Sequence, residues 1–110
     1  MSDYRIILTP DAIADLTDLR DYIAEVLLVP DTALRYIQTI RREIGGLARM
    51  PERHERVDHE PWKSRGLRRI TVKNFHVYYR IDETLKTVFV LNVIYARRDQ
   101  LKALSHLKLD

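Results

Sequence analysis

Cysteine is absent from this chain of 110 residues, and glycine occurs only three times. Without cysteine there is no disulfide framework and no thiolate ligand for a metal. The glycines, Gly45, Gly46 and Gly66, match neither the phosphate-binding loop nor the dinucleotide-binding fingerprint. The composition therefore argues against these nucleotide-binding classes and against a small disulfide-stapled domain.

Long apolar runs are missing as well. A membrane-spanning helix needs about 20 consecutive apolar residues, and no segment approaches that length. The first residues, Met1 to Tyr4, show no basic segment followed by an apolar one, so we predict no secretory signal. The length and the 45% hydrophobic content predict a single domain over residues 1–110. We expect a cytoplasmic protein that has no membrane partner.

The common catalytic motifs of hydrolases are also absent. His54 and His59 flank two acidic residues, but they are five positions apart, whereas the zinc-protease motif needs histidines four apart on one helix. Ser64 and Ser105 lack the flanking glycines of a nucleophile elbow. We therefore predict neither a metal site nor a cofactor.

Charge is distributed unevenly along the chain, whose formal net charge is +3. Residues 1–61 hold 8 Lys and Arg against 12 Asp and Glu, whereas residues 62–110 hold 11 against 4 and carry a net +7. A strongly basic half indicates either a polyanionic partner or a tightly bound acidic one. The alternative is that these side chains solvate exposed strand edges.

The first half of the sequence predicts a strand and two helices. Residues 4–8 form a short β-rich run, after which Thr9 can cap a helix and Pro10 suits its first position. Apolar residues then recur every three or four positions up to residue 27, and again between residues 33 and 47 after a break at Pro30. The short break predicts an antiparallel helical hairpin. Acidic residues off the first stripe are expected on a solvated face: Asp15, Asp18, Asp21 and Glu25.

The second half predicts a long polar loop followed by strands. Residues 51–66 form the loop, and β-rich runs follow over 67–72, 75–81 and 87–95, separated by hairpin-length turns. A tail after residue 96 contains Leu101, Leu104 and Leu107 and predicts a short helix. The order β-α-α-β-β-β predicts an α+β fold, with the helical hairpin packed on one face of a small, largely antiparallel sheet. We expect these residues in one core: Ile13, Leu16, Ile23, Ile37, Ile40, Phe75, Val77, Tyr79 and Leu91.

The run from residue 75 to residue 81 holds the most suggestive polar cluster. Alternation places His76, Tyr78 and Arg80 on the face opposite the better core face. Basic residues lie close by in the sequence at Arg68, Arg69, Lys73, Arg97 and Arg98. Such a cluster can neutralise phosphates, with Tyr78 as a stacking surface and His76 as a proton-transfer group. The alternative is a solvated sheet face on which Tyr78 stacks with an arginine.

Three stretches of the chain resemble the RelE/ParE superfamily of bacterial toxins. The first is Tyr4-Arg5-Ile6-Ile7-Leu8-Thr9-Pro10-Asp11-Ala12, and the second is Leu47-Ala48-Arg49-Met50-Pro51-Glu52-Arg53. The third joins Gly66-Leu67-Arg68-Arg69-Ile70, Tyr78-Tyr79-Arg80-Ile81-Asp82 and Val90-Leu91-Asn92-Val93-Ile94-Tyr95-Ala96-Arg97-Arg98-Asp99. The resemblance implies a type II toxin that halts growth when freed from its cognate antitoxin, a small acidic protein encoded nearby.

The superfamily divides by target, and the sequence has features of both branches. RelE-like members cleave messenger RNA on the ribosome, and Arg69 and His76 occupy positions where that branch carries basic residues. ParE-like members inhibit DNA gyrase; the segment from Tyr95 to Asp99 resembles that branch, and the tail lacks the tyrosine of the nucleases. We favour ribosome-dependent cleavage, with gyrase inhibition as the alternative. A plain nucleic-acid-binding module is disfavoured, because no recognition helix or aromatic RNA-binding strand is evident.

Cleavage would follow metal-free acid–base chemistry on the messenger RNA. A base removes the 2′-OH proton, cations stabilise the phosphorane-like transition state, and an acid protonates the leaving oxygen. His76 is the candidate proton-transfer group, and the expected charge stabilisers are Arg69, Lys73, Arg80 and Arg97. Substrate contacts are assigned to Arg68, Tyr78 and Arg98.

Overall fold

A computed structural model describes residues 3–26 and 30–95 and confirms the predicted α+β architecture. Strand β1 (Arg5–Leu8) leads into α1 (Pro10–Asp21), which ends in a π-helical turn, η1 (Tyr22–Val26). Helix α2 (Pro30–Gly45) follows, then two short 3-10 turns, η2 (Gly46–Ala48) and η3 (Pro51–Arg53). Strands β2 (Arg68–Val72), β3 (Phe75–Asp82) and β4 (Thr87–Tyr95) complete the described fold.

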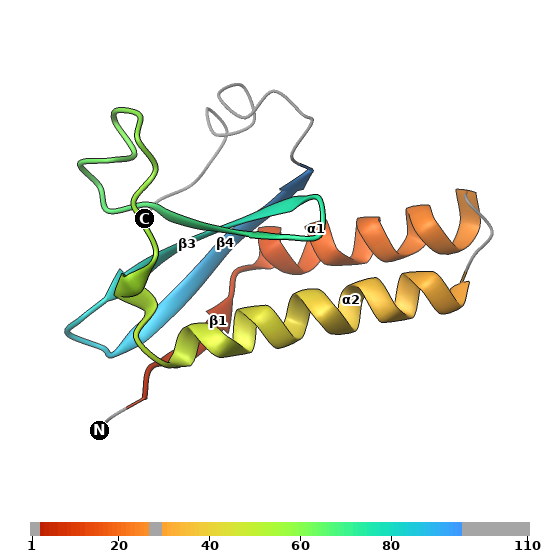
Figure 1. Cartoon of the computed structure of the whole chain (residues 1–110), viewed down its shortest axis with the longest axis horizontal. Helices are drawn as coiled ribbons and strands as arrows, with labels where there is room; N and C mark the ends of the chain where they lie inside the picture. Colours follow the sequence, from red (N-terminus) through yellow and green to blue (C-terminus); the bar gives the residue numbers. More distant parts are fainter. Residues whose placement is uncertain (1–2, 27–29, 96–110) are drawn as a thin grey trace.

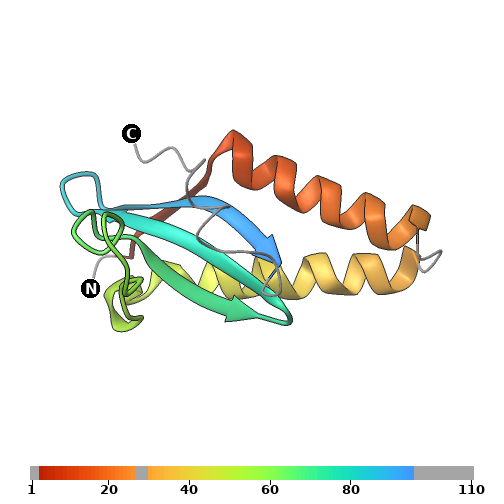
Figure 2. The same cartoon turned by 90° about the horizontal axis from the view of Figure 1, so that it is seen from above.

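The four strands form one mixed sheet in the order β1-β4-β3-β2. The pairs β2–β3 and β3–β4 are antiparallel, whereas β1 runs parallel to β4 at one edge. The two helices lie side by side along the sheet, and the end of α1 and the start of α2 extend past the end of the sheet (Figures 1 and 2). No helix within the described ranges is long and apolar enough to cross a membrane.

The start of α1 is capped as the sequence predicts. The hydroxyl oxygen of Thr9 accepts a hydrogen bond from the Ala12 N–H at 3.2 Å, and Pro10 takes the first helical position. These features favour a helix start because the first N–H groups of a helix have no partner within it. At its other end the α-helix stops at Asp21, earlier than the apolar pattern predicts, and continues as the π turn.

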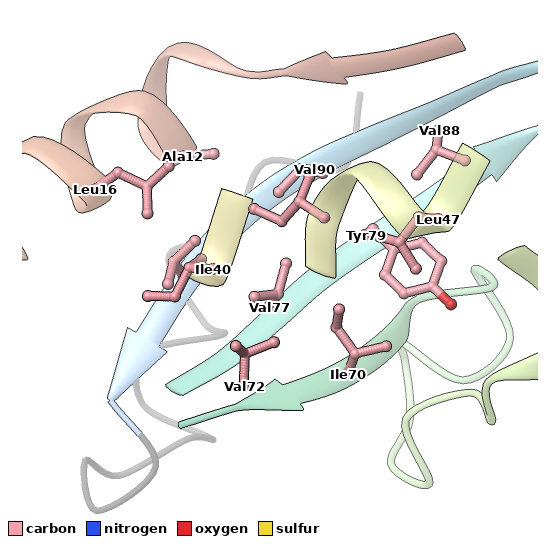
Figure 3. Close-up of a cluster of buried hydrophobic side chains, with 12 residues drawn as sticks. Ala12, Leu16, Ile40, Leu47, Ile70, Val72, Val77, Tyr79, Val88 and Val90 are labelled. Atoms are coloured by element: carbon pink, nitrogen blue, oxygen red, sulfur yellow. The ribbon is translucent and has the colours of Figure 1, made fainter. Parts of the chain in front are cut away.

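The main core fills the space between the helices and one face of the sheet (Figure 3). Leu16 of α1 and Ile40 of α2 pack there against Val77 and Tyr79 of β3 and Val90 of β4. Ile40, Val77, Tyr79 and Val90 have no exposed surface at all. The apolar faces of the helices and of the strands therefore pack against each other, as the sequence predicts.

Three residues of the predicted apolar stripes and core lie elsewhere. Ile13 is 49% exposed, because it follows the buried Ala12 by one position and therefore points about 100° away around the helix. Leu34 is 57% exposed, because it follows the buried Ala33 by one position and therefore lies on another face of α2. Leu91 is buried, but it alternates with Val90 along β4 and belongs to a second cluster on the opposite face of the sheet.

We call the sheet face opposite the helices the distal face, and the segment between η3 and β2 covers part of it. The buried cluster there is formed by these side chains: Val57, Leu67, Tyr78, Leu91 and Ile94, with Trp62 and Phe89 packed against them. A backbone hydrogen bond from the Val57 N–H to the Leu67 carbonyl closes the covering segment at 2.8 Å. The predicted loop is therefore a folded cover over the sheet.

Candidate functional site

The β2–β3 hairpin brings three polar side chains together on the distal face. Antiparallel pairing places Arg69 opposite Tyr78 and Thr71 opposite His76. Nδ1 of His76 lies 3.0 Å from the Thr71 hydroxyl, within hydrogen-bonding distance. Because residues paired across two strands share a face, the structure groups Arg69, Thr71 and His76 on one side of the hairpin.

Burial and charge favour the neutral form of His76. Partial burial lowers the pKa of His76 below its ordinary value, and the positive charge of Arg69 lowers it further. A neutral imidazole near pH 7 can accept a proton, which is the state that a general base requires. The geometry therefore suits a proton-accepting role for this residue.

Tyr78 cannot present the stacking surface that the alternation pattern suggested. Its side chain does lie on the distal face, as expected, but it is fully buried in the cluster beneath the covering segment. Burial raises the pKa of the Tyr78 hydroxyl, and interactions with Arg69 partly oppose that rise. A β-strand pattern gives the face on which a side chain lies, but it does not show what a distant loop places over that face.

Arg68 is separated from the other predicted site residues because its strand neighbour is Tyr79, on the helical side of the sheet. Its guanidinium donates to the carbonyl oxygen of Glu52 at 3.1 Å and to that of His54. Two backbone acceptors therefore already engage this side chain, which ties β2 to the start of the covering segment.

The remaining predicted cations are dispersed. Lys73 occupies the β2–β3 turn with a positive φ of 57°, and its Nζ lies 5.8 Å from the centre of the Tyr36 ring on α2. Arg80 stacks on Phe89, with its guanidinium carbon 4.3 Å from the ring centre. Arg97, Arg98 and the predicted tail helix lie outside the described residues.

A pocket of about 310 Å³ lies along β2 and includes two basic groups that the sequence patterns did not single out for this role. Arg53 and His54 line it together with Glu43 of α2 and with Arg69 and Thr71 of β2. The two groups follow Pro51 and Glu52, in a polar stretch whose histidines do not have metal-ligand spacing. Two neighbouring basic residues in a polar loop are too common in proteins to indicate a binding site by themselves.

The pocket has a predominantly positive lining. Nε of Arg53 lies 3.3 Å from Nε2 of His54 and donates to it. Burial lowers the pKa of His54, as do the charges of Arg53 and Arg68, while Glu43 opposes them. Two arginines and a neutral histidine against one carboxylate suit a polyanion or an acidic side chain. Within the described ranges, no group of three or more His, Asp or Glu residues could hold a metal.

Comparison with protein families gives one match across most of the chain. The model of the ParE toxin of the type II toxin–antitoxin system parDE matches residues 6–100. The sequence matches none of the curated proteins.

Solved structures with the same fold include several toxin–antitoxin proteins. A chain of a chromosomal ParDE toxin–antitoxin system from P. aeruginosa superposes with a TM-score of 0.71 at 24% identity, covering 86% of this chain and 97% of that one. A chain of the toxin–antitoxin complex RelBE2 from Mycobacterium tuberculosis gives 0.61 at 24% identity, with 86% and 93% covered. A free mutant of the E. coli toxin RelE gives 0.62 at 12% identity, with 94% and 93% covered. At these identities the superpositions concern the fold alone.

Proposed function

Because this chain belongs to the ParE toxin family of type II toxin–antitoxin systems, we propose that it arrests growth by binding and inhibiting DNA gyrase in the cytoplasm. Such a function needs an exposed binding surface but no catalytic constellation on the toxin itself. The chemistry of the described residues agrees with that requirement, since the cations first expected to act together lie on different parts of the fold.

The burial of Tyr78 is the observation that favours this target over messenger RNA. Recognition of unpaired RNA commonly stacks a splayed base on an exposed aromatic ring or on an arginine guanidinium. Tyr78 was the aromatic candidate for that role on β3, and its side chain has no exposed surface. Inhibition by protein–protein contact does not require such a ring.

The proposal is tested by two purified reactions run side by side. Relaxed plasmid, gyrase and ATP report supercoiling on an agarose gel, and a reconstituted translation system reports protein synthesis and the integrity of the messenger. We expect the chain to block supercoiling in proportion to its concentration while translation continues. Blocked translation with intact supercoiling would refute gyrase as the target.

Ribosome-dependent cleavage of messenger RNA remains the second candidate, because of His76. Its imidazole lies beside Thr71 and near the charge of Arg69, and both burial and that charge favour its neutral form. As a base it would take the 2′-OH proton, so that the 2′ oxygen attacks phosphorus and the 5′ oxygen leaves with a proton from an acid. For this mechanism, His76→Ala and Arg69→Ala should each abolish cleavage that occurs only with ribosomes present. Cleavage retained in the double variant would remove both residues from the mechanism.

We further propose that an acidic antitoxin binds and neutralises the chain. The net +7 of residues 62–110 supports an acidic partner. Two of the structural relatives are described as parts of a toxin–antitoxin system or complex. A partly disordered antitoxin segment that folds on binding could cover a large part of such a basic surface.

A further inference from the structure

A second pocket, of about 470 Å³, lies on the distal face beside the start of α1. Its apolar lining comes from Ile7 of β1 and from Phe89 and Leu91 of β4, and its charged lining comes from Arg80 and Asp11. Pairing of Ile7 with Phe89 and of Arg80 with Phe89 places these side chains on one face. The pocket shares Leu91 and Phe89 with the buried cluster beneath the covering segment, and its remaining lining comes from β1, the start of α1 and Arg80.

Arg80 is held in place but is not fully hydrogen-bonded. The central carbon of its guanidinium lies over the Phe89 ring, 4.3 Å from the ring centre. Its Nε is buried and has no acceptor among the residues that the structure describes. A buried donor without an acceptor is costly, and the pocket that Arg80 lines is where a ligand can bring an acceptor to its guanidinium.

We infer that this pocket binds a carboxylate side chain carried by an otherwise apolar peptide segment, and that the antitoxin supplies that segment. The carboxylate pairs with the Arg80 guanidinium, and neighbouring apolar side chains of the peptide cover Ile7, Phe89 and Leu91. This inference rests on the proposal that an acidic antitoxin neutralises the chain.

The lining favours one carboxylate over a nucleic acid. A polyanion gains from several cations at once, and the pocket beside β2 offers Arg53 and Arg69 for that purpose. Among the described residues, the lining of the pocket at Arg80 holds one arginine, the aspartate Asp11 and several apolar side chains. One negative charge on an apolar peptide matches that lining, and the basic second half of the chain draws acidic partners towards it.

The test uses the full chain and two short probes. Acetyl-Leu-Glu-Leu-amide and its control, acetyl-Leu-Gln-Leu-amide, are titrated into protein carrying 13C-labelled isoleucine methyl groups. We expect the Ile7 signal to shift, while that of the exposed Ile13 on α1 stays in place. The glutamate probe should bind about tenfold more tightly than the glutamine probe, since only the glutamate can form a hydrogen-bonded charge pair with Arg80.

Three variants distinguish binding of the probe in this pocket from a general effect of the protein's surface charge. Arg80→Gln should abolish the preference for the glutamate probe. Arg5→Gln, which removes an exposed arginine from the same strand as Ile7, should leave the preference unchanged. Asp11→Asn removes the competing carboxylate and should tighten binding of the glutamate probe.

Several outcomes would overturn the inference. Equal affinity for the two probes, or an unchanged preference in Arg80→Gln, would show that Arg80 binds no carboxylate. An Ile7 signal that moves with the concentration of the chain alone would assign the pocket to a second copy. Nuclear Overhauser contacts between Ile7 and residues 96–110 would assign it to the chain's own tail. Because no step uses gyrase, the ribosome or the antitoxin, failure here is distinguishable from failure of the proposed function.

Discussion

The carboxylate of Asp15, on α1, accepts a hydrogen bond from the backbone N–H of Val93, on β4, at 2.8 Å. The same oxygen accepts a second hydrogen bond from the side-chain amide of Asn92 at 3.1 Å. β1 pairs with β4 only as far as Val90, so Asp15 supplies a partner to β4 beyond the end of that ladder. Burial raises the pKa of Asp15, and the two hydrogen bonds partly oppose the rise. The expectation of a solvated Asp15 was therefore wrong.

Thr9 extends the same connection between α1 and β4. Its N–H donates to the Val90 carbonyl at 3.0 Å, and its hydroxyl donates to the Leu91 carbonyl at 3.0 Å. One residue thus caps the helix and also continues the sheet where β1 ends. Thr9 and Asp15 together anchor the helix on the edge of β4.

Replacement of Asp15 by alanine tests this anchor. Asp15→Ala leaves the Val93 N–H and the Asn92 amide without their acceptor, and we expect a loss of about 1–3 kcal/mol in the free energy of unfolding. Urea denaturation followed by circular dichroism measures it. Asp18→Ala, an exposed aspartate of the same helix, is the control and should change stability by less than about 0.5 kcal/mol. Equal effects of the two substitutions would contradict the role of Asp15.

The helix–sheet core is tested by two isoleucines that both belong to the predicted apolar stripes. Ile40→Ala should cost about 2–5 kcal/mol, because Ile40 is fully buried and the substitution leaves a cavity. Ile13→Ala should cost far less, since almost half of that side chain is exposed. Denaturant midpoints of the two variants make the comparison. A larger loss for Ile13 would refute the observed orientation of α1.

Tyr79 connects the core to η3, where the basic pocket begins. Its hydroxyl donates to the Pro51 carbonyl at 2.7 Å, and burial raises its pKa to about 12. Tyr79→Phe leaves that carbonyl without its donor, so we expect a loss of about 1–3 kcal/mol. Amide hydrogen exchange should also quicken at Arg53, whose N–H donates to Met50 within the same turn. Unchanged exchange there would show that η3 holds its position without Tyr79.

Titration of His76 tests the electrostatics of the distal face. Its midpoint, followed by the ring-proton shift in NMR, should lie below the ordinary value for histidine because burial and Arg69 both disfavour the charged form. Arg69→Ala should raise the midpoint, whereas Arg65→Ala, an exposed arginine of the covering segment, should leave it in place. Since the folded-state pKa is lowered, this group's contribution to stability is present above the unfolded pKa. That contribution is lost as the pH falls through the folded pKa.

Association with the antitoxin should depend on salt. Charge complementarity accelerates encounter more than it strengthens the final complex, and added salt screens it. Stopped-flow mixing with the acidic product of a neighbouring gene should therefore show an association rate that falls clearly between low and high ionic strength. A rate that does not respond to salt would mean that the basic half of the chain serves something other than this partner.

The sequence by itself determined the elements and their order. β4 spans Thr87–Tyr95, as predicted, and α1 begins at Pro10 behind its Thr9 cap. These features depend on residues within a few positions of one another: alternation along a strand, a three-to-four spacing along a helix, and a cap beside the turn that it satisfies. Local rules are sufficient for them.

Tertiary structure alone decided what each side chain meets. It buried Tyr78 under a segment that starts some twenty residues earlier, joined Asp15 to Val93 and gathered Arg53, His54 and Arg69 around one pocket. Residues that meet in this way lie on elements far apart in the chain. The local sequence around one of them does not indicate which residue it contacts. A strand shows which way Tyr78 points, but only the packed fold shows whether water or another part of the chain lies there.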